Sequence, residues 1–155
     1  MFGLFKKKDK DNVSKAVYKA AVTPRVVNPK AVSFKIRPII EAYIKAIYSQ
    51  DSSILPSRMM RDEIYASTVS SIAEDKKLCQ RTCSTVTVGQ IAASDYDSTT
   101  LYTVRSIEFT CIFNIKGSCN GMIVDERRKA IFTFINDQRQ GWSLDDWQDL
   151  GSVDS

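Results

Sequence analysis

The chain has 155 residues, of which 43% are hydrophobic and 26% are charged. It is therefore long enough for one domain with a real core, and its composition argues against wholesale disorder. No apolar stretch approaches the roughly 20 residues that a membrane-spanning helix needs. Histidine is absent, which removes the usual general base at neutral pH and the commonest metal ligand.

The positive charge is concentrated at the N-terminus. Residues 1–30 carry eight basic and two acidic side chains, a net of +6, while the rest of the chain carries fourteen basic and sixteen acidic ones, a net of −2. The part of the chain after residue 30 is therefore close to neutral. It lacks the excess of basic residues that binding to a nucleic-acid phosphate backbone requires. We therefore expect no nucleic-acid binding through the folded part.

The first ten residues place large apolar side chains beside lysines. Such a segment can attach a chain to an anionic membrane surface, with the apolar groups inserted and the lysines at the headgroups. A frayed, soluble tail is the favoured alternative, because so short an apolar block binds membranes weakly. Asp9 and Asp11 count against a mitochondrial presequence. The candidate attachment residues are Phe2, Leu4, Phe5, Lys6, Lys7, Lys8 and Lys10.

Prolines separate this leader from a folded domain. A short helix is predicted for residues 11–23, after which Pro24 and Pro29 favour extended chain. We divide the sequence into a basic tail and linker (1–32), a domain (33–150) and a short tail (151–155). Ser33 is the expected N-cap of the first helix of the domain.

Two helices are predicted at the start of the domain, near residues 35–49 and 58–77. Apolar side chains in the first recur at the spacing of a helix with one buried face. They are Ile36, Ile39, Ile40, Tyr43, Ile44, Ile47 and Tyr48. The second is poorer in helix formers, so its packing must support it. Its expected inward residues are Met60, Ile64, Val69 and Ile72.

Four antiparallel strands follow, near residues 81–92, 100–116, 127–136 and 141–148. Gly89 is expected at a bulge in the first strand, and a charged turn leads from the second strand to the third. Side chains of the long second strand alternate between two faces, and neither face is wholly polar. The predicted fold is α+β, with two N-terminal helices packed on one face of a strongly curved four-stranded antiparallel sheet.

Short motifs in the last two strands carry a resemblance to a known family. They comprise the acidic-basic turn Asp125-Glu126-Arg127-Arg128, the strand residues Ile131, Phe132 and Phe134, and the pair Trp142 and Leu144. On these residues, and over about residues 34–150, the chain resembles the nuclear transport factor 2-like superfamily. The likeness is greatest to the branch of the mitochondrial inner-membrane translocase tether and related bacterial and mitoribosomal proteins. Trp147 departs from the pattern, which more often has a smaller aliphatic residue there.

The resemblance implies a cone-like sheet and a core built on large side chains. The expected core anchors are Tyr43, Phe109, Phe113, Phe132, Phe134, Trp142 and Leu144. Family members include tethers of membrane-associated machinery, but also isomerases and dehydratases. The motifs consist of core residues, so they indicate a fold more strongly than a function.

Catalysis is the minority hypothesis. Enzymes of this superfamily typically use an Asp, or an Asp–His arrangement, with a tyrosine as oxyanion donor. Here histidine is absent, and we place Arg105 and Glu108 on opposite faces of their strand. We predict no catalytic residue and no cofactor. A small-ligand-binding or enzymatic protein of the isomerase or dehydratase type remains the alternative.

The cysteines do not form a convincing metal motif. Three residues separate Cys79 from Cys83, a spacing found in zinc sites, but seven separate Cys111 from Cys119 and no histidine completes a set. A disulfide would need an oxidising compartment that no signal supports. Four free thiols and no metal site are the favoured interpretation.

The acidic residues near the C-terminus are interpreted first as a solvated rim. The alternative is a docking surface for a basic partner, with an exposed tryptophan among the carboxylates. That surface would consist of Trp147, Asp145, Asp146 and Asp149.

The sequence therefore predicts a non-catalytic module that binds a protein partner. The module would be a subunit or tether of a larger assembly. If the leader inserts into a membrane, it would attach this assembly to the membrane surface. A homo-oligomer formed through the sheet face is a further expectation. The expected location is intracellular: cytoplasmic, peripheral to an inner membrane, or in the mitochondrial matrix.

Overall fold

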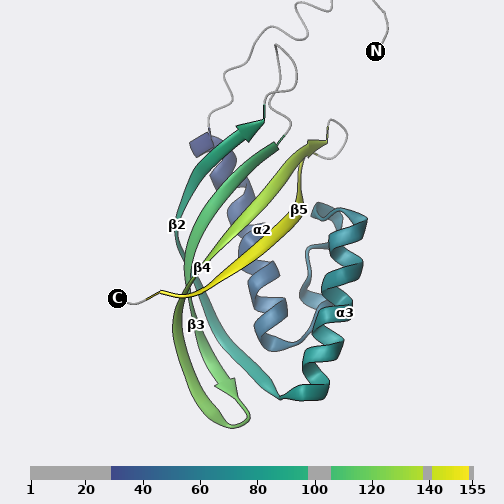
Figure 1. Cartoon of the computed structure of the whole chain (residues 1–155), viewed down its shortest axis with the longest axis vertical. Coiled ribbons are helices and arrows are strands. Elements are labelled where there is room, and N and C mark those ends of the chain that lie inside the picture. Colours follow the sequence, from purple (N-terminus) through teal and green to yellow (C-terminus); the bar gives the residue numbers. More distant parts are fainter. Residues whose placement is uncertain (1–28, 98–105, 138–140, 154–155) are drawn as a thin grey trace, which may run out of the picture. The chain divides into compact units, whose positions relative to one another are not determined.

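The computed structural model describes residues 29–97, 106–137 and 141–153, apart from the side chains of residues 29, 94–97 and 137. The leader, the helix predicted over 11–23 and the first residues of the long strand lie outside these ranges. The helical elements are α2 (Pro29–Ser49), the 3-10 turns η1 (Ser52–Ile54) and η2 (Ser57–Met59), and α3 (Asp62–Leu78). The strands are β2 (Arg81–Asp97), β3 (Ser106–Cys119), β4 (Met122–Asp137) and β5 (Gly141–Ser152) (Figure 1).

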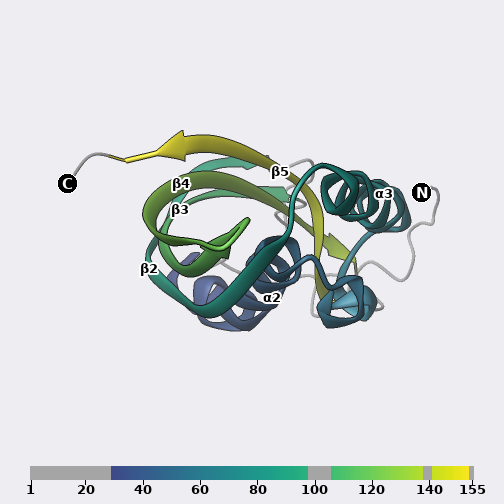
Figure 2. The ribbon, with the colours of Figure 1, turned by 90° about the horizontal axis from the view of Figure 1, so that it is seen from below.

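The strands form one antiparallel sheet in the order β2-β3-β4-β5. Both α2 and α3 pack against this sheet (Figure 2). The predicted α+β class, two helices packed against a four-stranded antiparallel sheet, is confirmed. Each strand pairs with its neighbour in the sequence, so the chain builds the sheet in simple succession.

Helix α2 supplies the apolar stripe that its spacing predicts. Four residues of the predicted stripe are fully buried: Ile36, Ile40, Tyr43 and Ile44. The helix begins at Pro29, earlier than predicted, because proline suits the first helical position. Ser33, the expected N-cap, lies inside the helix, where its Oγ donates a hydrogen bond to the Lys30 carbonyl. Neither α2 nor any other described helix has the apolar run that crossing a membrane would require.

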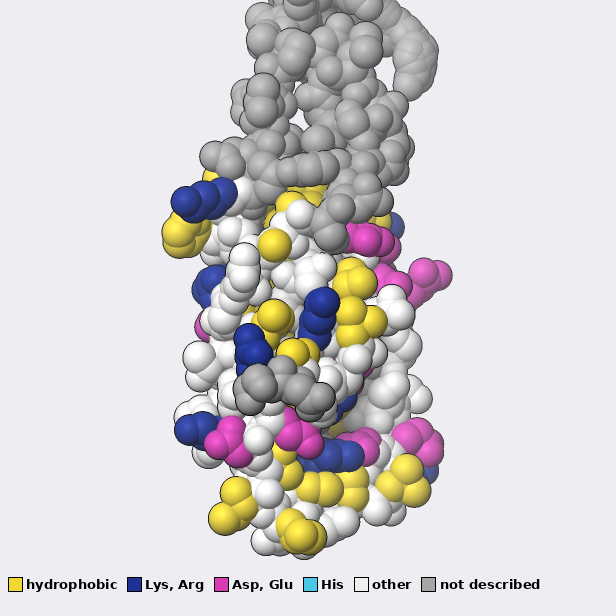
Figure 3. Space-filling model, turned by 60° about the vertical axis from the view of Figure 1, so that its left-hand side comes forward, with side chains coloured by type: hydrophobic (Ala, Val, Ile, Leu, Met, Phe, Trp, Pro, Cys, Tyr) yellow, Lys and Arg dark blue, Asp and Glu magenta, His cyan; other side chains and the backbone are white. Residues whose placement is uncertain are grey.

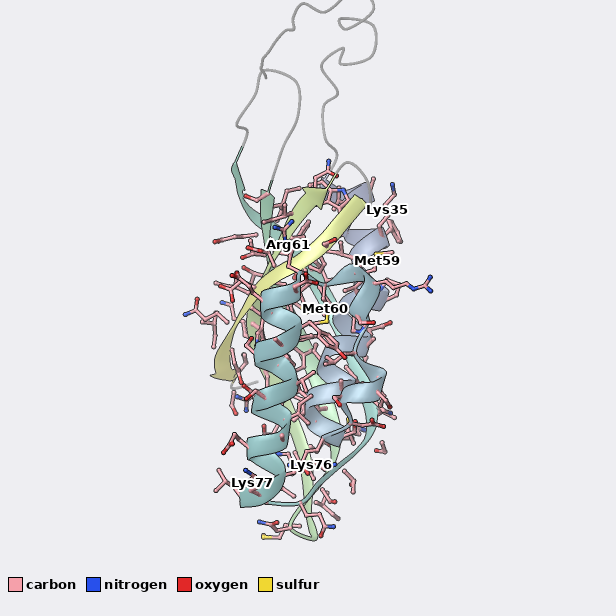
Figure 4. The ribbon with its side chains drawn as sticks, turned by 90° about the vertical axis from the view of Figure 1, so that its right-hand side faces the viewer. Lys35, Met59, Met60, Arg61, Lys76 and Lys77 are labelled. Carbon is pink, nitrogen blue, oxygen red and sulfur yellow. The ribbon has the colours of Figure 1, made fainter. Side chains whose placement is uncertain are left out.

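Helix α3 begins later than predicted because the residues before it join the sheet. Met60 forms a parallel bridge with Leu144 of β5, and the Arg61 N–H donates to the Leu144 carbonyl at 2.9 Å. Figure 4 shows Met60 and Arg61 at the start of α3, beside β5. Within α3, Thr68 is buried and its Oγ1 lies 2.9 Å from the Tyr43 hydroxyl. This bond ties α3 to α2.

The turn between β3 and β4 lies at Asn120 and Gly121, not at the charged residues 125–128. Both turn residues have positive φ, 51° and 82°, as a type I′ hairpin requires. The predicted turn at Asp125-Glu126-Arg127-Arg128 is therefore wrong, and these residues continue strand β4. The Asn-Gly pair was the stronger local signal, because few other residues adopt this backbone without strain.

Strand β2 is longer than predicted and irregular, and α2 covers its free edge. Its register with β3 shifts at three places, one of them between Val88 and Ile91, so the bulge predicted at Gly89 is confirmed. Arg37 of α2 donates to the carbonyls of Val88 at 2.7 Å and Gly89 at 3.0 Å. Such side-chain caps satisfy carbonyls that an edge strand would otherwise offer to another chain.

The core between helices and sheet is filled by aromatic and aliphatic side chains. Of the predicted anchors, the following are at most 1% exposed: Tyr43, Phe109, Phe113, Phe132, Phe134 and Leu144. Trp142 is only partly buried. Trp147 packs instead on Tyr43 and Phe132, with ring centroids 5.3 and 5.9 Å apart. The bulge between Thr133 and Phe134 places Trp147 opposite Phe132, on the core face, whereas Trp142 pairs with Asn136 near the start of β5.

We expect Trp147→Ala to lower the free energy of unfolding by about 3 kcal/mol, since it removes a large side chain from this aromatic cluster. Trp142→Ala should cost less, because among the described residues Trp142 makes no ring contact. Urea unfolding of the two variants beside the wild type checks the order. A larger loss for Trp142→Ala would contradict it.

Candidate functional site

One end of the sheet brings together the β3–β4 turn, the last residues of α3 and the start of β2. We call residues 78–83 and 117–124 the hairpin end (bottom of Figure 1). Asn120 joins its two parts, because its N–H donates to the Gln80 carbonyl at 2.7 Å and its Oδ1 accepts from the Gln80 N–H at 2.8 Å. The turn is therefore fixed to the chain that leaves α3.

A polar cluster behind the hairpin end holds three elements together. Gln50, just after α2, is 5% exposed. Its Nε2 donates to Asp75 Oδ2 at 2.8 Å, and its Oε1 accepts from the Arg81 N–H at 3.0 Å. The Arg81 Nε donates to Asp75 Oδ2 at 2.8 Å, and its second nitrogen reaches Oδ1 at 3.3 Å. We call Gln50, Asp75 and Arg81 the clasp.

The opposite charges of Asp75 and Arg81 stabilise each other within the clasp. The hydrogen bonds from Arg81 are the main reason that the pKa of Asp75 lies below its usual value, and the same bonds raise the pKa of Arg81. Both side chains are about one third exposed. Asp75 is therefore ionised, and the pair charged, at neutral pH.

A cavity of about 150 Å³ opens beside the clasp. It is lined by Tyr48, Arg81, Thr82, Cys83, Ile115, Lys116, Gly117, Ser118, Cys119, Val124 and Glu126. A cavity of this volume accepts a group the size of benzene, whereas sites for drug-sized ligands measure about 300–1,000 Å³. The cavity therefore suits one side chain better than a free metabolite.

The titratable groups around the cavity do not form an acid–base pair. Burial raises the pKa of Tyr48 to about 12, so its hydroxyl stays protonated at neutral pH. The Tyr48 ring packs near Phe113, at a centroid distance of 6.4 Å. Glu126 accepts a hydrogen bond from Arg128 at 2.9 Å. Neither group is arranged as a general base for the other.

Three half-buried cysteines lie at or beside the cavity, and a fourth, Cys111, is in the core; all four thiols are free. Burial raises the pKa of Cys79 and Cys83, which keeps them as weakly nucleophilic thiols. Cys119 accepts a long hydrogen bond, 3.6 Å, from Arg81. Within the described ranges, no three Cys, Asp or Glu side chains are grouped as metal ligands.

The hairpin end exposes three large apolar side chains. Leu78, Met122 and Ile123 are 83%, 74% and 91% exposed, and residues 117–124 contain no charged side chain. In Figure 3, hydrophobic side chains gather at this end, beyond a band of mixed charge. Figure 4 places Lys76 and Lys77 on the adjoining last turn of α3. Large apolar side chains are therefore exposed close together at this end of the sheet.

The structure places the sequence-predicted site residues elsewhere. The leader residues from Phe2 to Lys10 lie outside the described ranges. Asp149 pairs with Arg128 at 2.9 Å, and Trp147 packs in the aromatic cluster. Trp147 is therefore half-buried, not exposed, and the partner surface of Trp147, Asp145, Asp146 and Asp149 stays a prediction. Asp145 and Asp146 lie on β5 away from the hairpin end, with Asp146 exposed.

The hairpin end was not identified in the sequence analysis, although part of the pattern that marks it is visible in the sequence. The uncharged segment 117–124 surrounds an Asn-Gly pair, and a turn that carries Met122 and Ile123 at its end exposes them. No local sequence pattern marks Gln50 as part of a site, because its hydrogen-bond partners lie 25 and 31 residues away in the sequence.

No protein-family model matches the chain, and no curated protein matches its sequence.

We expect Asp75→Asn to lower the free energy of unfolding at neutral pH by about 2 kcal/mol, because it removes charge-assisted bonds from Arg81. The folded-state pKa of Asp75 is depressed, so this stabilisation is present above the unfolded-state pKa of about 3.9 and is lost as pH falls through the folded value. Urea unfolding at neutral pH and near pH 3 should show the gap between wild type and variant shrinking in acid.

Glu74→Gln is the matched control. Its carboxylate is 70% exposed and lies 3.5 Å from Lys77, and such surface pairs contribute little. Equal losses for the two variants, or a gap for Asp75→Asn that persists in acid, would contradict the assigned role of the clasp.

Proposed function

We propose that this chain is a non-catalytic protein-binding module that works as a subunit or tether of a larger assembly. The observation that carries the proposal is the hairpin end, where Leu78, Met122 and Ile123 are exposed beside a cavity of about 150 Å³. Apolar anchors entering small pockets are the usual source of binding energy between proteins.

The interior favours a module over an enzyme. The space between helices and sheet holds fully buried rings, including Tyr43, Phe109 and Phe132. The Tyr43 hydroxyl bonds to Thr68, and burial raises its pKa well above the usual value, so it is unsuited to proton transfer at neutral pH. The alternative of a small-ligand-binding or enzymatic protein has less support, because its pocket would have to lie in this filled space.

We also propose that the chain is a member of the nuclear transport factor 2-like superfamily, in the translocase-tether branch, with a cone-like sheet. The order of two helices followed by an antiparallel succession of strands supports this. Bulges increase the bend and twist of a strand, and the register shifts in β2 and β5 supply several.

The test of the module is co-purification. A tagged full-length chain should retain its partner chains under mild detergent, and Met122→Ser/Ile123→Ser should lose most of them, because it removes two exposed apolar side chains. Mass spectrometry of the captured chains provides the measurement.

Phe34→Ser is the control for this capture. Phe34 is 72% exposed on α2, so its replacement removes a comparable exposed ring outside the hairpin end. Equal capture by the wild type and the Met122/Ile123 variant would overturn the proposed role of the hairpin end.

The leader supplies a second, separable prediction. If its lysines meet an anionic membrane, each contributes on the order of 1 kcal/mol. Full-length chain should therefore float with anionic vesicles and lose this binding as salt rises. A chain starting at Lys30, and neutral vesicles, are the comparisons. If both chains behave alike on both lipids, the membrane role of the leader is excluded.

A further inference from the structure

We propose that two copies of this chain join through their hairpin ends, with the Met122 side chain of each copy seated in the cavity of the other. This inference rests on the proposed role of the hairpin end as a docking surface and names a second copy as its occupant. The partner copy thereby completes the cavity.

The size and chemistry of the cavity fit a methionine side chain. Its volume is about 150 Å³, and its apolar lining comes from Tyr48, Ile115 and Val124. A space of that volume accepts a benzene-sized apolar group. The unbranched, flexible thioether of methionine adapts to irregular gaps of this kind.

The protruding side chain and the cavity lie next to each other on the same element. Met122 pairs with Cys119 across the turn, and Cys119 lines the cavity. Met122 and Val124 share one face of β4 because they are two residues apart. In a two-fold symmetric dimer, both copies use the same surface patch. That patch must carry both the inserted side chain and the cavity that receives it, and the hairpin end contains both.

The charges around the hairpin end allow two copies to meet. Residues 117–124 are uncharged, and the charged side chains that line the cavity are of both signs: Arg81, Lys116 and Glu126. Arg81 and Glu126 are paired within the copy, with Asp75 and Arg128, and Lys116 is exposed to solvent. A large single-sign field, which would keep copies apart, is therefore not present among these described residues.

The first experiment is sedimentation equilibrium of the full chain in reducing buffer over a wide concentration range. A contact confined to one end of the sheet is small, so we expect a weak, concentration-dependent dimer. Met122→Ser should weaken it by at least about tenfold, because each of the two copies loses a buried apolar side chain, and Phe34→Ser should leave it unchanged. A chain that stays monomeric, or a dimer equally strong in Met122→Ser, overturns the inference.

A second measurement locates the contact. In a mixture of isotope-labelled and unlabelled copies, isotope-filtered NOEs should connect the Met122 methyl of one copy to the methyls of Ile115 and Val124 of the other. A dimer without these NOEs overturns the inference. If the chain is monomeric while capture of other proteins still depends on Met122 and Ile123, the occupant is another protein, and the proposed function stands without this dimer.

Discussion

The clasp of Gln50, Asp75 and Arg81 is the interaction on which the rest of this arrangement depends. Three elements meet there: the end of α2, the last turns of α3 and the first residue of β2. Gln50 has a φ of 56°, so the chain turns sharply at a residue that also bonds to both other elements. A buried amide with several partners fixes one geometry, because any other would leave polar groups unpaired.

The packing above the clasp engages the large side chains of the interior with one another. Tyr43 illustrates this, since its ring contacts Phe132 and Trp147 and its hydroxyl is bonded to Thr68. A side chain with all of its surface and its polar atom engaged stabilises the fold.

At the surface, the hairpin end combines rigidity with exposure. Strands β3 and β4 pair continuously up to Cys119 and Met122, and Asn120 bonds the turn to Gln80. The apolar groups at the tip are thus held on paired strands, which lowers the entropic cost of binding a partner. Leaving Ile123 91% exposed gains nothing for folding, and the proposed binding role accounts for it.

The sequence by itself determined the helices, the succession of strands and most of the core, because the periodicity of apolar residues reports which face of one element is buried. It predicted the burial of Tyr43 and Ile44 in α2 for that reason. Only the tertiary structure decided the position of Trp147, the clasp and the cavity. A bulge in β5 places Trp147 opposite Phe132, and the clasp joins Gln50 to residues 25 and 31 positions away. Such contacts depend on how elements dock, and no local pattern records that.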